Sequence, residues 1–279
     1  MKNILVPTDF SACATHAIDA AYQLAQKFGS TVHLLHVITD TRNDEKQHEW
    51  NQAIENANVL LDKIKAEHTN VETISLTATG KLVDLLQEYA TAHGIDLIVM
   101  GSHGASGKQE YFIGSNTQKV VRSVFANVLV VKDKLEDINF NKVVFASSFN
   151  QTERDAFLKF KEFVKHFVPE IHLVMVHTSS LFDPPYVVSQ EAMKDFQGLC
   201  EPFDSHIHIY RDFTIEKGIR TFADLLRWDR QDLHARFGSM GDRLWHLARG
   251  EDRRRVSANA PVKSISKETT FFEDSANTE

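Results

Sequence analysis

Residues 96–116 read Asp-Leu-Ile-Val-Met-Gly-Ser-His-Gly-Ala-Ser-Gly-Lys-Gln-Glu-Tyr-Phe-Ile-Gly-Ser-Asn, an apolar run that ends in a glycine-rich loop. The apolar residues after Asp96 predict a strand that is buried on both faces of a sheet. Where a loop of this kind leads into a helix, free backbone N–H groups and the positive end of the helix dipole attract phosphate. Glycines there tolerate positive φ and let an anion approach closely. The expected contacts are the backbone at Gly101, Gly104 and Gly114 and the hydroxyl of Ser115.

Three further apolar runs have the same character, at residues 4–6, 32–37 and 128–131. Between the first two, residues 12–28 place alanines and a leucine on one helical face, and another helical pattern begins at Val83. Alternating strands and helices indicate an α/β fold with a doubly wound, Rossmann-like parallel sheet. Such sheets bind ligands beyond the carboxyl ends of their strands, at the switch point. The residues at those ends are Pro7, Thr8, Asp9, Val37, Met100 and Gly101.

The glycine spacing resembles the nucleotide-binding loop of the universal stress protein family. Two residues separate Gly101 from Gly104, nine separate Gly104 from Gly114, and Ser115 follows. This spacing fits neither the Walker A loop nor the dinucleotide fingerprint. The stretch Ile4-Leu-Val-Pro-Thr-Asp-Phe-Ser11 is similar to the first strand and loop of the same family. The resemblance covers residues 1–134 and implies an adenine nucleotide alpha hydrolase-like fold with ATP as the ligand, and Mg²⁺ bridging its phosphates.

The resemblance also implies a role for each site residue. Asp9 would accept hydrogen bonds from ribose hydroxyls or from the adenine amino group, and the main chain at Val37 would line the base pocket. Asp9 and Ser11 fit a helix cap before Ala12 equally well. The residues expected around the nucleotide are Pro7, Thr8, Asp9, Val37, Met100, Gly101, His103, Gly104, Gly114, Ser115 and Asn116. His103 suits a loop-stabilising hydrogen bond better than acid or base chemistry, because no carboxylate lies near it in sequence.

The second half of the chain begins as a repeat of the first. Residues 142–149 align with residues 3–10, and a second pair of apolar runs aligns at the same offset, which indicates another unit over residues 140–219. Ser148 stands in the place of Asp9, and Ala146 in that of Pro7, so this unit is predicted not to bind nucleotide. The repeat is incomplete, because no further Asp-Leu-Ile-Val type strand, Gly-x2-Gly loop or closing strand follows it.

Residues 220–255 resemble the thumb region of Y-family translesion polymerases of the polymerase IV type, with the joint expected at 218–223. The polymerase palm, which holds the catalytic metal ions, has no counterpart, so polymerase activity is excluded. Acidic residues interspersed among the arginines disfavour DNA binding. Residues 256–279 are polar and aperiodic and are expected to be poorly ordered. The apolar positions expected to cover the incomplete sheet are Trp228, Leu233, Phe237, Leu244, Trp245 and Leu247.

The composition suits a cytoplasmic protein. The formal net charge of −7 over 279 residues argues against general binding to nucleic acid or to anionic membranes. Cys13 and Cys200 lie far apart without metal-ligand spacing, which favours a reducing compartment. No signal peptide is expected, since Met1-Lys-Asn leads directly into a strand, and no apolar stretch approaches the roughly 18 residues of a membrane span.

These observations favour an ATP-binding module of the stress response that binds nucleotide rather than catalysing a reaction, with slow hydrolysis at most, because no general base is positioned by sequence. The strand Val128–Val131 lacks its expected mate within the chain, which predicts a homodimer through that edge. Two alternatives stay open: a ligand-free interaction protein, and a DNA-associated fragment acting through the polymerase-like tail.

Overall fold

A computed structural model describes residues 1–39, 47–102, 114–178 and 186–248. The chain divides into two compact units, Met1–Asn139 and Phe140–Glu279. The predicted site residues His103 and Gly104 and the predicted tail at 256–279 lie outside the described residues.

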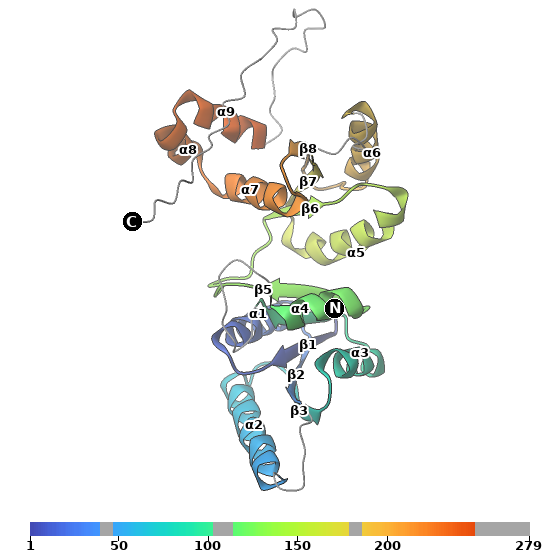
Figure 1. Cartoon of the computed structure of the whole chain (residues 1–279), viewed down its shortest axis with the longest axis vertical. Coiled ribbons are helices and arrows are strands. Elements are labelled where there is room, and N and C mark those ends of the chain that lie inside the picture. Colours follow the sequence, from blue (N-terminus) through green and yellow to red (C-terminus); the bar gives the residue numbers. More distant parts are fainter. Residues whose placement is uncertain (40–46, 103–113, 179–185, 249–279) are drawn as a thin grey trace, which may run out of the picture. The chain divides into compact units, whose positions relative to one another are not determined.

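The first unit is built on a five-stranded parallel sheet with the order β3-β2-β1-β4-β5 (Figure 1). Its strands are β1 (Asn3–Thr8), β2 (Thr31–Ile38), β3 (Thr73–Thr79), β4 (Leu97–Gly101) and β5 (Asn127–Val131). The strand order changes direction between β1 and β4, which makes this the switch point of a doubly wound sheet. The predicted α/β class is thus confirmed.

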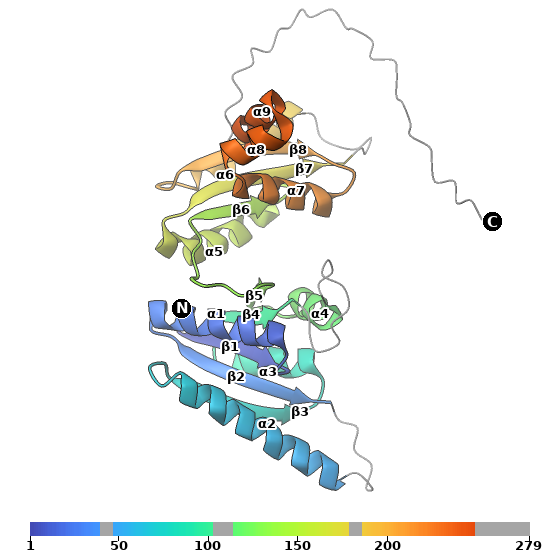
Figure 2. The same ribbon diagram turned by 90° about the vertical axis from the view of Figure 1, so that its left-hand side faces the viewer.

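Four helices cover the two faces of this sheet (Figure 2). They are α1 (Ala12–Phe28) and α2 (Gln47–Glu67) on one face, and α3 (Leu82–Ala92) and α4 (Ser115–Ser123) on the other. The buried side of α1 is rich in alanine, which lets the helix backbone approach the sheet closely. On the other face, Leu5, Leu35 and Ile98 pack with Leu86 of α3 and Val120 of α4. This packing fixes the start of α3 and of α4 at the carboxyl edge of the sheet.

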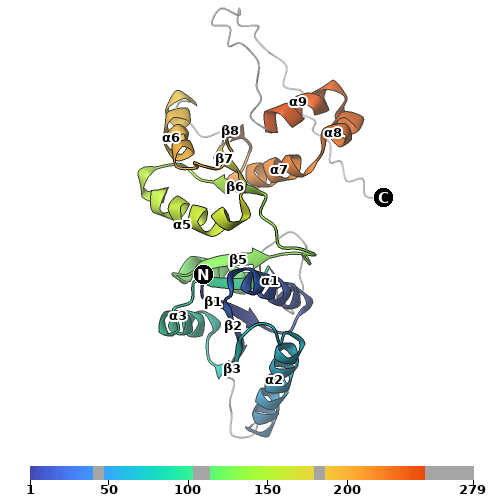
Figure 3. The ribbon, with the colours of Figure 1, turned by 180° about the vertical axis from the view of Figure 1, so that it is seen from behind.

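The second unit has a three-stranded parallel sheet with the order β6-β7-β8 (Figure 3). Its elements are β6 (Lys142–Ala146), η2 (Gln151–Glu153), α5 (Arg154–Val164), η3 (Lys165–Phe167), β7 (Glu170–His177), α6 (Tyr186–Gly198), β8 (Ser205–Arg211), α7 (Ile215–Arg227), α8 (Arg230–Phe237) and α9 (Ser239–Ala248). Within the described ranges β6 pairs only with β7, whereas its counterpart β1 lies between two strands. The second sheet is therefore a partial copy of the first.

The backbone hydrogen bonds repeat at the predicted offset. At the entry to β2, the Thr31 N–H donates to the Lys2 carbonyl at 2.8 Å, and at the entry to β7 the Glu170 N–H donates to the Asn141 carbonyl at 2.7 Å. Both α1 and the helical turn before α5 have a side-chain cap, at Ser11 and at the matching Asn150. The second unit therefore keeps the frame of the first although their side chains differ.

Helix α7, rather than α8 and α9, covers the face of the second sheet opposite α5 and α6. It runs from Ile215 without a break through the expected joint at 218–223, and its buried Phe222 and Leu226 pack against Val174 of β7. Helix α7 follows β8, the third strand of the second unit, as α3 follows β3 in the first. It therefore covers the sheet face that was expected to be covered by residues 228–247. Leu233 of α8 is instead buried beside α9, where the absence of a side chain at Gly241 leaves room for its carbonyl.

Candidate functional site

A cavity of about 620 Å³ lies in the first unit at the carboxyl ends of β1, β2 and β4. It brings together every predicted site residue that the structure describes, from four separate stretches of the chain. These residues are Pro7, Thr8, Asp9, Val37, Met100, Gly101, Gly114, Ser115 and Asn116. The convergence follows from the parallel topology, because strands of one sheet end at a common edge.

Further lining residues were not predicted from the sequence. They are Ala14, Leu35, Thr39, Gly80, Lys81, Leu82, Val83, Asp84, Thr117 and Lys119. Most of them belong to the end of β3 and the first turn of α3 or to the first turns of α4. They were not predicted because β3 was not predicted: its threonine-rich sequence at residues 73–79 does not form a continuous apolar run.

One wall of the cavity is apolar. Leu35 and Met100 are buried on the sheet, and Val37, Leu82 and Val83 are partly buried beside them. A flat, weakly polar ring can lie against such a wall with little desolvation penalty.

The starts of two helices form another end of the cavity. Helix α4 begins behind Gly114, and helix α3 begins behind Lys81, and neither helix has a side-chain hydrogen bond at its N-cap. The first backbone N–H groups of a helix have no partner within the helix, so both ends offer donors and a positive dipole. The ammonium groups of Lys81 and Lys119 belong to the same lining, together with the carboxylates of Asp9 and Asp84. This end is suited to phosphate.

Gly101 and Gly114 do not have the positive φ angles that were expected at this loop. Gly114 has φ −58°, and Gly101 is not among the described residues with positive φ. A Cβ at Gly101 would lie 2.7 Å from the Cys13 carbonyl oxygen. Glycine is therefore needed at this position because the first turn of α1 packs directly against the end of β4.

Two hydrogen bonds fix α4 to the end of β4. The Thr117 hydroxyl donates to the Gly101 carbonyl at 3.0 Å, and this bond is buried. The Gly114 N–H donates to the Ser102 carbonyl at 2.7 Å. The start of α4 is thus held at the cavity by contacts that need no ligand.

The structure separates the two roles considered for the loop after β1. The Ser11 hydroxyl, and not Asp9, caps α1 by accepting a hydrogen bond from the Ala14 N–H at 3.3 Å. The Asp9 carboxylate accepts from the Ser11 N–H at 3.1 Å, and its side chain is exposed at the cavity. Asp9 is therefore oriented by its own loop rather than used as the helix cap.

The corresponding edge of the second unit holds a carboxylate of the protein itself. Glu153 matches Ala14 in the repeat, and its Oε2 accepts hydrogen bonds from the Ser147 hydroxyl at 2.6 Å and the Ser148 hydroxyl at 3.0 Å. Burial opposes ionisation of Glu153, but these two hydroxyls and two backbone N–H groups outweigh it and lower its pKa. An ionised carboxylate at this position repels phosphate.

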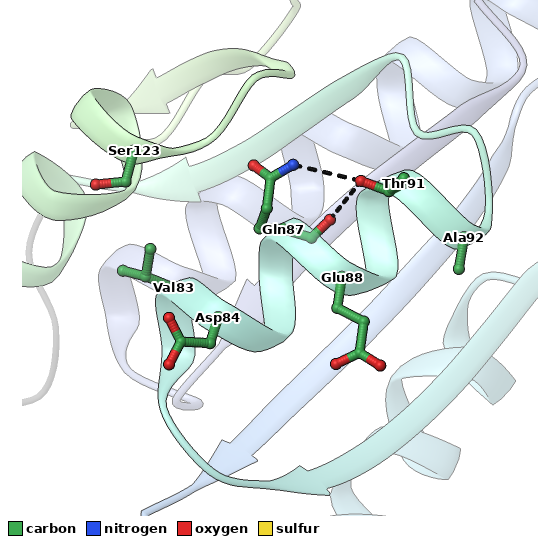
Figure 4. Close-up of a pocket in the computed structure, with 7 residues that line it drawn as sticks. All are labelled: Val83, Asp84, Gln87, Glu88, Thr91, Ala92 and Ser123. Carbon is green, nitrogen blue, oxygen red and sulfur yellow. Dashed lines mark hydrogen bonds between the residues drawn. The ribbon is translucent and has the colours of Figure 1, made fainter.

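A second depression lies on the outer surface between α3 and α4 (Figure 4). It is lined by Val83, Asp84, Gln87, Glu88, Thr91, Ala92 and Ser123. The Gln87 amide donates to the Thr91 hydroxyl at 3.3 Å (Figure 4). This surface lacks strand ends and glycine loops, so it does not have the features of an anion site.

Comparison with known proteins places the first unit in a family. The sequence model of the universal stress protein family matches residues 1–132. A universal stress protein of Methanocaldococcus jannaschii is 30% identical over 156 residues, which cover 48% of this chain and 96% of that protein. The chain belongs to the universal stress protein family.

A solved structure matches a larger share of this universal stress protein. A universal stress protein from Archaeoglobus fulgidus matches 80% of this chain and 82% of its own with a TM-score of 0.63 at 23% identity, which shows a shared fold. Another universal stress protein, solved in complex with cAMP, is 21% identical over 47% of this chain and 96% of its own, with a TM-score of 0.39.

A separate segment of the chain is similar to a different family. A DNA polymerase IV of Mesorhizobium japonicum is 53% identical over 64 residues, which cover 23% of this chain. The chain spans only 15% of the length of that polymerase. The universal stress protein described here is thus fused, in the manner of a chimera, to a short polymerase-like segment. Among its described residues, no helix combines the length and the apolar character that a membrane crossing requires.

Proposed function

We propose that the first unit binds an adenine nucleotide, ATP in particular, and acts in the stress response as a binding module rather than an enzyme. The observation that carries the proposal is the cavity at the switch point, where two helices without side-chain caps meet an apolar wall. Its volume of about 620 Å³ lies within the usual range for small-molecule sites.

The cavity suggests an orientation for the nucleotide. Adenine would lie against Leu35, Val37 and Met100, because these residues form the apolar wall. The ribose would lie near Asp9, whose carboxylate accepts hydrogen bonds. The phosphates would face the backbone N–H groups of Ser115 and Asn116 at the start of α4, where an anion is stabilised by the helix dipole.

Magnesium would depend on the nucleotide for most of its ligands. In the described part of the chain, no group of three or more His, Cys, Asp or Glu side chains could hold a metal ion. Mg²⁺ commonly binds through phosphate oxygens, water and one or two carboxylates. Asp84 is a carboxylate of the cavity that could bind such a nucleotide-bound ion.

The same proposal includes a homodimer and a cytoplasmic location. Strand β5 is an edge strand of its sheet, and Val128, Leu129 and Val130 are partly exposed. An apolar edge of this kind favours pairing with a second copy. Cys13 and Cys200 are both free thiols, which suits a reducing compartment.

Isothermal titration of the full chain with ATP and with AMP tests the binding proposal. Gly114→Val is a suitable variant, because the φ of −58° at Gly114 accepts a side chain without backbone strain, while the added methyl groups would enter the cavity. We expect saturable ATP binding that weakens at least about tenfold in this variant, a loss of about 1.4 kcal/mol. A folded wild-type protein that shows no heat with millimolar ATP would favour the ligand-free interaction protein.

A further inference from the structure

The loop between β1 and α1 contains a phenylalanine in a left-handed backbone conformation. Phe10 has φ 60°, and among the described residues other than glycine only Phe149 and Val168 also have a positive φ. A bulky residue keeps this conformation only where its surroundings hold it, and such residues gather at functional sites. Phe10 directly follows Asp9, which lines the cavity. The contacts that hold Phe10 therefore bear on where the Asp9 carboxylate lies.

Two contacts hold Phe10, one from β1 and one from β2. The Phe10 N–H donates to the Thr8 hydroxyl oxygen at 3.0 Å. The Phe10 ring stacks on that of His36, with the centroids 4.7 Å apart and the ring planes at 27°. His36 Nδ1 donates to the Thr8 carbonyl at 2.8 Å, because a carbonyl oxygen can only accept. The stack thus ties the turn to β2, and His36 is itself fixed to the end of β1.

The stacked rings lie outside the cavity. Neither Phe10 nor His36 is among the described residues that line it. His36 lies between Leu35 and Val37 in β2, and both of these neighbours line the cavity. Because successive side chains of a strand point to opposite faces of the sheet, the His36 ring lies on the other face. Any effect of the stack on a ligand must therefore pass through the backbone of the loop.

The second unit has the same turn with a different anchor. Phe149 matches Phe10 in the repeat, has φ 56°, and donates its N–H to the Ser147 hydroxyl oxygen at 2.9 Å. Its side chain is only 1% exposed, and its ring packs against those of Phe145 and Phe196. Phe10 is instead only partly buried. The left-handed turn is thus anchored by the hydrophobic core in the second unit and by a partly exposed aromatic stack in the first.

We propose that Phe10, through its stack on His36, is a positioning residue that holds the Asp9 carboxylate in the nucleotide cavity, an inference that rests on the function proposed above. Without the ring, the backbone at residue 10 relaxes toward the negative φ that residues other than glycine prefer. The peptide that joins Asp9 to Phe10 then rotates, and the hydrogen bond from the Ser11 N–H that orients the carboxylate is lost. The contact of Asp9 with the ligand weakens although the residue is still present.

A double-mutant cycle, measured by isothermal titration of the full chain with ATP, tests this role. Phe10→Leu keeps an apolar side chain but removes the flat ring, and it should weaken ATP binding about five- to tenfold. Asp9→Ala should weaken binding about tenfold or more, because a charged hydrogen-bond acceptor is lost. In the Asp9→Ala background, Phe10→Leu should have no further effect, because no carboxylate remains to be positioned. Equal losses from Phe10→Leu in the two backgrounds would refute the positioning role.

Two further variants separate positioning from a general loss of stability. Phe10→Tyr retains the aromatic ring and should bind ATP as the wild type does. Phe149→Leu changes the same turn in the second unit, where Ser148 stands in place of Asp9, and it should lower the melting temperature without changing ATP affinity. If ATP affinity falls as much in Phe149→Leu as in Phe10→Leu, the loss has a general cause and the inference is wrong.

If Phe10→Leu does not fold, His36→Gln tests the same stack, because glutamine removes the ring and keeps an amide that can donate to the Thr8 carbonyl. We expect the same loss, again confined to proteins that have Asp9. Wild-type affinity in His36→Gln, or in Asp9→Ala, would overturn the inference and leave ATP binding intact. A folded wild type that does not bind ATP would instead remove the proposed function, and the positioning role with it.

Discussion

Val168 occupies in the second unit the left-handed backbone position that Gly29 occupies in the first. The two residues match in the repeat, and their φ angles are 50° and 64°. Glycine adopts this conformation without strain, whereas a β-branched residue does not. The second unit therefore has the same left-handed turn after its first helix, but with valine in place of the glycine that favours this conformation.

Val168→Gly should stabilise the second unit by about 1 kcal/mol, because it relieves the strained φ and Val168, at 77% exposed, loses little packing. Urea unfolding of a Trp50→Phe background, followed by Trp228 and Trp245 fluorescence, measures the effect. Val168→Ala should gain less, since alanine retains the steric conflict. Equal stability of the glycine variant and the wild type would show that the turn carries no strain.

Gly101→Ala should destabilise the first unit by about 2–4 kcal/mol, because the new methyl would meet backbone atoms of Cys13 rather than a flexible side chain. Thermal unfolding monitored by circular dichroism measures the loss. Gly29→Ala is the matched control: nothing lies within 4 Å of its added Cβ, so only the left-handed φ opposes it, and the loss should be about 1 kcal/mol. A Gly101→Ala protein as stable as wild type would refute the close-packing role.

Ala14→Glu should place in the first cavity the carboxylate that Glu153 provides in the second unit. ATP affinity should then fall more than about tenfold, because the carboxylate takes up phosphate donors and repels the phosphates. Titration calorimetry measures the loss, with the melting temperature as a check on folding. Glu153→Ala is the control and should leave ATP affinity unchanged. If both variants bind ATP as the wild type does, the phosphate does not lie beside Ala14.

The stability of the first unit should decrease on acidification through His33. Burial lowers the pKa of His33, nearby His93 lowers it further, and Glu72 partly opposes them. An imidazole with a lower pKa in the folded than in the unfolded chain stabilises the fold while neutral, so the contribution is complete above about pH 6.5 and declines as the pH falls below it. Unfolding free energies at pH 7 and pH 5 measure the change, which should be smaller in His33→Asn. An identical pH dependence in that variant would assign it to other groups.

Leu129→Lys should convert the proposed dimer into a monomer, because a charge on the β5 edge disfavours pairing of two apolar strands. Size-exclusion chromatography with light scattering at micromolar concentration measures the mass. Leu60→Lys, at an exposed position of α2, is a control that should remain dimeric. A monomeric wild type would refute the dimer itself.

Elements with a strong local sequence pattern could be predicted from the sequence alone. The continuous apolar runs identified β1, β2, β4 and β5, and the repeat offset located β6 and β7. Strand β3 was missed because strands were recognised by continuous apolar runs, whereas Ile74 and Leu76 are exposed and alternate with hydroxyl residues, which is the pattern of a strand with one solvated face. Lys81 and Asp84 follow β3, so they were missed with it.

The details of the site depended on contacts between distant residues. Gly101 was predicted as a backbone contact for phosphate, whereas the constraint that the structure shows there is the close approach of α1, which no local pattern contains. The position of Glu153 could be aligned with Ala14, yet its hydrogen bonds to Ser147 and Ser148 depend on how the loop closes. Pattern reasoning located the edge of the sheet, and packing determined what each residue does there.

The carboxylate of Glu153 gives the second unit an internal substitute for a ligand. Its loop is held together by the protein's own donors, so this half of the molecule should have the same conformation in nucleotide-rich and nucleotide-depleted cells. The first unit has Ala14 at the matching position, and it should become more rigid when its cavity fills. The conformation of the first unit would thus depend on nucleotide concentration, and that of the second unit would not. A partner protein that binds both units would sense this difference.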